Sequence, residues 1–512
     1  RKLEVEERVS LLELIQKEIG IHEGLNDRGS AVFIVLDDPK DRKKDGKKEP
    51  DAPWDGPPCL LAVAVTDYAK VARQLGVDSP KDGINDGQAG VGSGLLAAIG
   101  GAGPDGKSPK SPVIFSKRGD FVLLARPRDR DALDKVLKSK QSIAPALQPA
   151  REWLDQQDIS GVCTQRGLHK AGLFMMGAGV ESGTPEQVGG LKDTFAEVEK
   201  NVKLIAFAGN IDHAGHPRLL ARVYFDPDGA YAKWIAQVQP ADGSMLARLP
   251  DRPFLLAGLA RVSAQASYEG LIRLMMSDLP AESRDKLTAK ADQLVRRVSE
   301  VGFAIYMDQP GKKEPTVDGG LVARVDDAPA FVAGTVEVLK QVHEATKDKA
   351  EVKFEQKTLA GRPSWVIGYV PKSEPKDGIA LAGGIAPATD RAGVVVLTEL
   401  DRQTVLVSTP EKADPEVVVK RFADIPKQPL AKNAALQKAA ATLPEKLQLA
   451  AYLNVQLIVP FFGLALDEPA PVAFALRALP AGLEAQFVVP FETLQAVVKA
   501  DKAQKKSQPK EK

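Results

Sequence analysis

Two distant segments of the sequence resemble each other, and this internal repeat constrains the fold more than any other feature. Phe121–Val136 aligns with Thr404–Val419 at an offset of 283 residues (404 minus 121). In both segments an apolar strand ends at a proline, and an acidic stretch then starts a helix. A period this long indicates duplicated domains, not a solenoid of short units. The matching positions are Val122/Val405, Leu123/Leu406, Pro127/Pro410, Asp131/Asp414 and Val136/Val419.

The same offset extends the repeat back to the start of the chain, where Arg1 lines up with Arg284. The sequence therefore predicts one repeat domain at residues 1–240 and a second at 251–500, joined by a linker and followed by a disordered charged tail at 501–512. The strand and helix predicted over 254–276 have no partner in the first half. We expect an equivalent segment to have preceded Arg1, or the second half to supply it.

The order of the predicted elements favours an α+β fold. Each of the two related domains is expected to form a mostly antiparallel sheet with helices packed on one face. Hydrophobic residues make up 44% of the chain and charged residues 27%, which is typical of a globular protein. The polar, glycine-rich stretches at 39–58 and 77–112 read as insertions or functional loops.

The charge balance argues against a nucleic-acid partner. The 69 basic and 68 acidic residues leave a formal net charge of +1, whereas phosphate binding needs a basic face. No apolar run approaches the roughly 20 residues of a transmembrane helix. Because the chain starts at Arg1 without Met, we expect that an upstream segment such as a signal peptide is missing from it.

The chain has two cysteines, Cys59 and Cys163, each in an apolar run expected to be a strand. Buried free thiols are the favoured interpretation. The alternative is a disulfide that closes a loop of 104 residues (163 minus 59), which would stabilise the fold by about 4 to 5 kcal/mol. No paired Cys or Cys–His spacing indicates a zinc or catalytic site.

The segment with Asp212, His213 and His216 holds the only two histidines that are close in sequence, and it resembles a metal site. Two imidazoles three residues apart on a turn hold a metal only if a further ligand converges on them, so an exposed polar turn is the favoured interpretation and no metal is predicted. The glycine-rich segments at 90–94 and 177–179 lack the Lys-Ser/Thr of a phosphate loop. No cofactor and no catalytic residue is predicted.

The stretch from Leu457 to Leu466 is the strongest candidate for an exposed apolar contact, through Leu457, Phe461, Phe462 and Leu464. Core packing is the favoured interpretation of this stretch. The methionine pairs at 175–176 and 275–276 suit an adaptable apolar groove or, again, ordinary core packing.

The repeated pattern of strand, proline, acidic helix start, Ala/Leu-rich helix and a strand such as 449–455 (Leu-Ala-Ala-Tyr-Leu-Asn-Val) resembles repeat-containing bacterial exported or envelope proteins of unknown function. This resemblance implies a location outside the cytoplasm, in the periplasm or secreted, and supplies no active residues. The leading hypothesis is a non-enzymatic binding or scaffold module with an unknown protein or envelope partner. The alternatives are a carrier of an apolar ligand such as a lipid and, third, a hydrolase without a recognisable motif.

Overall fold

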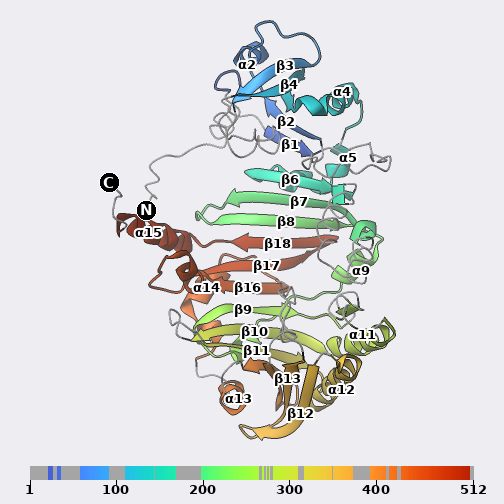
Figure 1. The fold of residues 1–512 in the computed structure, drawn as a ribbon, viewed down its shortest axis with the longest axis vertical. Coiled ribbons are helices and arrows are strands. Elements are labelled where there is room, and N and C mark those ends of the chain that lie inside the picture. The colour runs from blue at the N-terminus through green and yellow to red at the C-terminus, as the bar shows by residue number, and fades with distance from the viewer. Residues whose placement is uncertain are drawn as a thin grey trace. The chain divides into compact units, whose positions relative to one another are not determined.

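The computed structural model confirms the predicted α+β class. It describes residues 21–26, 31–35, 58–90, 110–142, 144–165, 198–264, 281–308, 316–348, 350–372, 393–410, 414–423 and 428–507, with a few further positions between 167 and 280. The strands form two sheets in which every pairing between described strands is antiparallel (Figure 1).

The chain divides into two compact units, Arg1–Pro145 and Ala146–Lys512. This division does not fall at the predicted linker near 240–251. The physical reason is that strands from both sides of the linker pair within one sheet: Pro217–Phe225, before the linker, pairs with Gly482–Val488, after it. The backbone hydrogen bonds of this pair place β6 (Ile159–Thr164), β7 (Val202–Ile211) and β8 (Pro217–Phe225) of the first predicted half in the same sheet as the strands of the second.

The first unit contains a five-stranded sheet. In sheet order its strands are β1 (Ala31–Val35), β2 (Cys59–Ala64), β5 (Phe121–Ala125), β4 (Lys110–Arg118) and β3 (Asn85–Gly90). β3 lies within the stretch predicted to be a loop, so that prediction was wrong for 85–90. Asp67 caps helix α2 (Tyr68–Gln74), because its side chain accepts a hydrogen bond from the N–H of Lys70 at 3.1 Å. The unit also contains η1 (Pro127–Asp129) and α4 (Arg130–Lys138).

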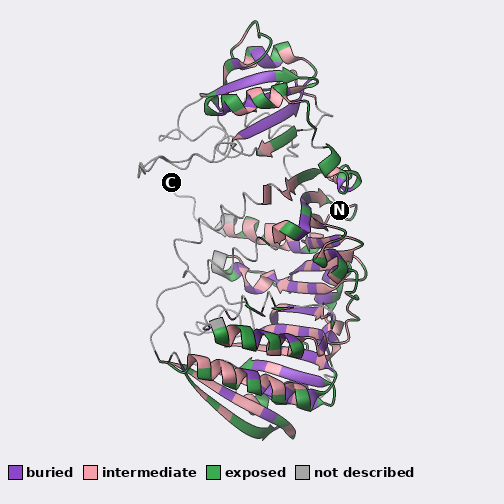
Figure 2. Cartoon of the chain, turned by 90° about the vertical axis from the view of Figure 1, so that its right-hand side faces the viewer, coloured by how far each residue is buried: buried purple, intermediate pink, exposed green. Residues whose placement is uncertain are grey.

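The second unit is built on a 13-stranded sheet. In sheet order its strands are β12 (Ala350–Leu359), β13 (Arg362–Pro371), β14 (Gly393–Asp401), β15 (Thr404–Pro410), β11 (Thr316–Val325), β10 (Val298–Asp308), β9 (Phe254–Arg261), β16 (Leu449–Asn454), β17 (Pro471–Leu479), β18 (Gly482–Val488), β8 (Pro217–Phe225), β7 (Val202–Ile211) and β6 (Ile159–Thr164). Buried and more exposed residues alternate along many of these strands (Figure 2).

Helices and short 3₁₀ helices connect these strands. They are α5 (Ala144–Leu147), α6 (Arg151–Leu154), α9 (Ala230–Ile235), η2 (Leu246–Arg248), α11 (Ala281–Val295), α12 (Ala328–Thr346), α13 (Pro415–Ala423), η3 (Leu430–Lys432), α14 (Ala434–Ala440), η4 (Val455–Leu457), η5 (Val459–Phe462) and α15 (Phe491–Ser507). The predicted disordered tail is helical as far as Ser507, because the Ala, Lys and Gln residues after Asp501 favour helix and extend α15.

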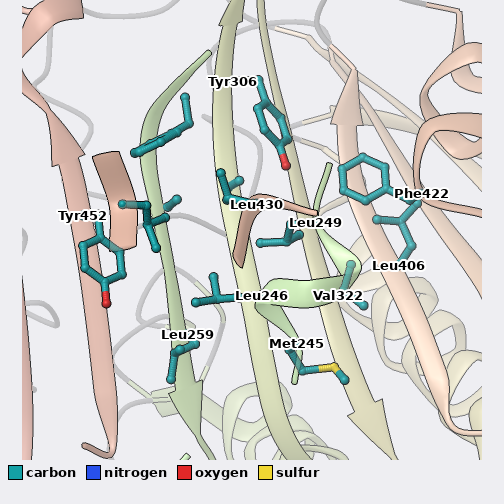
Figure 3. Packing of buried hydrophobic residues seen from close by; sticks show 14 of the residues in the cluster. Met245, Leu246, Leu249, Leu259, Tyr306, Val322, Leu406, Phe422, Leu430 and Tyr452 are labelled. Carbon is teal, nitrogen blue, oxygen red and sulfur yellow. The ribbon is translucent and has the colours of Figure 1, made fainter. Parts of the chain in front are cut away.

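Helices cover both faces of the sheet around β15, whereas the sequence predicted helices on one face. Val405 packs in the hydrophobic cluster to which α12 contributes, and the adjacent Leu406 packs in the cluster to which α13 contributes. Neighbouring residues of a strand point to opposite faces of the sheet, so the two clusters lie on opposite faces. Both side chains are fully buried, so this strand is apolar on both sides. On the α13 side, Leu249, Leu430 and Tyr306 belong to one packed cluster (Figure 3).

The strand orders of the two sheets correspond to each other. β4 and β14 start 283 residues apart (393 minus 110), as do β5 and β15 (404 minus 121). The order β1-β2-β5-β4-β3 then matches β10-β11-β15-β14-β13, and β6-β7-β8 matches β16-β17-β18. The duplication remains a prediction, and this shared order supports it.

Candidate binding surface

Four large hydrophobic side chains are exposed on one face of β6, β7 and β8. Their exposed fractions are 57% for Ile159, 49% for Phe207, 66% for Ile211 and 64% for Leu219. They share a face because Gly209 lies opposite both Ile159 and Leu219, and because alternate residues of β7 point the same way. We call this group of four residues the apolar face.

The sequence of β7 makes this strand apolar on both sides. Its inward residues, Leu204, Ala206 and Ala208, are buried in one cluster with Trp153 of α6. The outward positions of such a strand are normally polar, yet Phe207 and Ile211 of β7 are large hydrophobic residues. An apolar group of this size on an exposed sheet face is a feature of interaction sites.

The apolar surface continues from β8 onto β18 and β17. Leu219 lies opposite Phe487 of β18, and Phe487 lies opposite Phe474 of β17. Both phenylalanines are half-buried. Gly161 of β6, opposite Phe207, leaves open space where a side chain would be. The apolar face therefore borders the half-buried phenylalanines of β18 and β17 on one side. On the other side, Gly161 leaves space that no side chain fills.

A buried ion pair holds β8 and β18 together on the opposite side of the sheet. Nε of Arg222 lies 2.6 Å from Oε2 of Glu484, which is only 1% exposed. Arg477 lies 2.6 Å from the other carboxylate oxygen, and Gln486 also donates to it. Burial alone would raise the pKa of Glu484, but the donors from Arg477 and Arg222 outweigh it and lower that pKa. This network fixes the register beneath the apolar face.

A second cluster of charged groups lies where the predicted linker crosses β10. Glu300 has no exposed side-chain surface and accepts hydrogen bonds from the N–H of Gly243 at 3.0 Å and the hydroxyl of Ser244 at 3.3 Å. Arg324 binds Asp242 at 3.0 Å and also contacts Ser244. Burial, together with the neighbouring Asp242 carboxylate, raises the pKa of Glu300 to about 7, whereas the pKa of Asp242 is lowered.

This cluster fastens the linker to the sheet. The backbone of Met245 lies directly over Gly302, where an added Cβ would come within 2.8 Å of it. Beyond that contact, Met245, Leu246 and Leu249 enter the hydrophobic cluster shown in Figure 3. Sequence reasoning missed this site. The available signal was Glu300 itself, a carboxylate within an otherwise apolar strand.

The predicted Asp212, His213 and His216 motif forms the turn between β7 and β8. Oδ1 of Asp212 accepts from the N–H groups of Ala214 and His216, and Oδ2 accepts from Arg218 at 2.5 Å. Nδ1 of His216 accepts from the N–H of Phe491 at 2.9 Å, and His213 is exposed. Among the described residues, no group of three His, Cys, Asp or Glu side chains is placed to hold a metal ion.

The predicted apolar contact at Leu457–Leu466 lies mainly in η4 and η5. Leu457 is buried and Leu464 is half-buried, so Leu457 does not face solvent. The side chains of Phe461 and Phe462 lie outside the described residues. Apart from Met276, which packs beside α11 and α12, the predicted methionine pairs also lie outside them, as does the insertion at 39–57.

Both cysteines are free thiols in the structure. Cys59 is buried in the first unit and Cys163 is half-buried in β6 of the second. Burial raises the pKa of each thiol, which disfavours the reactive thiolate form. The disulfide between them remains a prediction that mass analysis can test.

A groove of about 340 Å³ lies between α12 and the adjoining strands. Val332, Val336 and Trp365 provide apolar walls, while Lys340 and Glu399 add charge. The Lys340 ammonium lies 5.0 Å from the centre of the Trp365 ring. This mixed lining differs from the purely hydrophobic side chains of the apolar face.

Comparisons with protein-family models and with curated proteins find no match. Among solved structures, crystal form III of TP0453 aligns with 51% of this chain and 98% of its own at 13% identity and a TM-score of 0.25. Crystal form I of TP0453 aligns with 52% of this chain and 98% of its own at 14% identity and a TM-score of 0.22. No helix in the described part of the chain is long and apolar enough to cross a membrane. No family is assigned to the chain.

Proposed function

We propose that this protein is a non-enzymatic binding module and that the apolar face on β6, β7 and β8 is its contact surface for a protein partner. The observation that supports this function is the exposure of Phe207, Ile211 and Leu219 on adjacent strands. Covering these side chains removes apolar surface from water at a gain of roughly 25 cal/mol per Å². Large hydrophobic and aromatic residues are also the usual anchors of protein interfaces.

The rigidity of the surrounding sheet supports this proposal. β7 and β8 are paired along almost their full length, and β8 is paired in turn with β18. The Arg222–Glu484 ion pair fixes the register at that junction. A surface held in one conformation loses little entropy when a partner binds, which favours its use as a preformed interface.

Native mass spectrometry of protein purified from its own host tests the proposal. We expect a protein-sized adduct that a Leu219→Lys variant loses, since a buried lysine at the interface is costly. Val370→Lys is the matched control, because Val370 is also an exposed hydrophobic, at 55%, but lies on β13 outside the apolar face. A lipid-sized adduct that depends on Leu219 would instead support the carrier of an apolar ligand.

We further propose a location outside the cytoplasm, supported by the pattern-level resemblance to exported bacterial proteins. Protease treatment of host cells whose outer membrane has been permeabilised and whose inner membrane is intact tests this location. Digestion of this protein while a cytoplasmic marker stays intact is the expected result. Protection of both proteins contradicts an extracytoplasmic location.

A further inference from the structure

The outer edge of β6 has no partner among the described strands. β6 pairs with β7 on one side and ends the 13-stranded sheet on the other. An unpaired edge presents a row of main-chain N–H and C=O groups, which can pair with another extended segment. This edge uses main-chain groups and is therefore separate from the side chains of the apolar face.

The two edge strands of the 13-stranded sheet differ in how many charged side chains they carry. The opposite edge strand, β12, alternates charged residues such as Lys353, Glu355 and Lys357, which natural proteins use to block pairing at an edge. β6 has the sequence Ile-Ser-Gly-Val-Cys-Thr, with no charged residue and no proline. Among the described strands, the β6 edge therefore lacks both a partner and the charges that protect the β12 edge.

The counterpart of β6 shows which kind of strand fits. In the matching order of strands, β16 corresponds to β6, and β16 pairs with β9 on the edge that β6 leaves open. β9 runs antiparallel to β16, with Leu449 opposite Ala260 and Leu453 opposite Leu256. Its sequence, Phe-Leu-Leu-Ala-Gly-Leu-Ala-Arg, is apolar and rich in small residues.

The first unit, considered by itself, lacks the same strand. β1 corresponds to β10, which pairs with β9 as well as with β11. Among the described strands β1 pairs with β2 alone, and Val32 and Phe33 on it are 46% and 41% exposed. Among the described strands, two separate sheets therefore each have no partner on the edge that β9 occupies in the second half.

We propose that the outer edge of β6 binds an extended segment of a partner protein, antiparallel to β6 and apolar with small residues in the manner of β9. The repeat indicates how this segment would pair with β6, because β9 already pairs antiparallel with β16 in the second half. Because the sequence of β6 is uncharged, β6 favours an apolar segment over a charged one.

The hydrogen bonds of β9 show which of its amides face each neighbour. The N–H of Arg261 donates to O of Gln448, next to β16, at 2.7 Å, and the N–H of Val262 donates to O of Ser299, in β10, at 3.0 Å. Because the direction alternates along a strand, the amides of Ala257 and Leu259 face β16, and those of Gly258 and Ala260 face β10. The first pair is the one that would face β6.

A labelled synthetic peptide with the sequence of residues 252–263 tests the proposal on the full-length protein. We expect it to bind and to slow hydrogen–deuterium exchange at 159–164 but not at 350–359. N-methylation at the amides equivalent to Ala257 and Leu259 should weaken binding about tenfold or more, since two main-chain hydrogen bonds are lost. N-methylation at the Gly258 and Ala260 equivalents is the matched control and should leave binding unchanged.

Three outcomes would overturn the proposal. The first is unchanged exchange at 159–164 with the peptide present. The second is equal binding of the two methylated peptides, which would indicate apolar adhesion without strand pairing. The third is protection of 159–164 in the free protein that increases with protein concentration, which would identify a second copy of this chain as the occupant. A Leu219→Lys variant that keeps peptide binding separates this edge from the proposed apolar face.

Discussion

Arg222 and Glu484 are 262 residues apart in the chain, yet they lie opposite each other on adjacent strands and form an ion pair of 2.6 Å. The pair lies where the last strand of each predicted half, β8 and β18, meets the other. β6, β7 and β8 of the first predicted half thereby join the strands of the second half in one sheet. This junction places further apolar surface, including Phe487, beside the apolar face.

Replacing Glu484 by Ala should lower the free energy of unfolding by about 3 to 5 kcal/mol, because Arg222 and Arg477 would be left without their shared carboxylate. Chemical denaturation measures the loss. Glu355→Ala is the control, since its ion pair with Lys357 is half-exposed on both sides and should contribute under about 1 kcal/mol. Equal losses in the two variants would show that the junction is not held by this pair.

Glu300 should make the protein less stable as the pH rises from about 4.5 to 7. Burial raises its pKa from 4.5 to about 7, so in this range the folded state retains a proton that the unfolded state has released. The pKa of Asp242 is lowered from 3.8, so its contribution is lost only at more acidic pH. Stability should fall by at most about 1.4 kcal/mol per pH unit.

Thermal unfolding of Glu300→Gln across this pH range checks the assignment. The variant should lose the downward slope, because glutamine does not titrate. Glu355→Gln, at an exposed position, should retain it. A slope that persists in Glu300→Gln would assign the titration to another group.

Gly302→Ala should destabilise the protein by about 1 to 3 kcal/mol, since the new Cβ would press on the backbone of Met245 where the linker crosses β10. Gly368→Ala on β13 is the control, because a Cβ there meets open space. Denaturation midpoints compare the two. A neutral Gly302→Ala would mean that the linker is not tightly packed on the sheet.

Alkylation of the unfolded, unreduced protein should modify both Cys59 and Cys163, which are free thiols in the structure. Intact mass spectrometry counts the added groups. Two added groups per chain are expected. If none is added until a reductant is supplied, the alternative disulfide is present.

Local sequence patterns predicted much of the fold because the ends of strands and the starts of helices depend on interactions between residues that are close in sequence. The proline at the end of β15 and the acidic start of the helix that follows it each act within a few residues. The pairing of β8 with β18 was beyond reach, since no local pattern specifies a partner more than 250 residues away. The apolar face was missed for a related reason: Phe207 and Leu219 look like core residues until the sheet shows which side of each strand is uncovered.

The exposure of the apolar stretch at Leu457–Leu466 could not be predicted from its sequence. Leu457 belongs to a hydrophobic run without strand or helix periodicity, so its exposure was open to two interpretations, and it is in fact buried. The Glu300 cluster depends on contacts between the linker, β10 and β11. Its raised pKa arises from burial, which composition and spacing do not reveal.

Photo-crosslinking in living host cells tests the central claim most directly. A benzoylphenylalanine at position 207, on the apolar face, should form a discrete protein adduct, whereas the same group at the exposed position 353 of β12 should not. The adduct from position 207 should disappear when Leu219→Lys is added and persist with Val370→Lys. Equal adducts from 207 and 353, or none from 207, would contradict the assignment of this face as the binding surface.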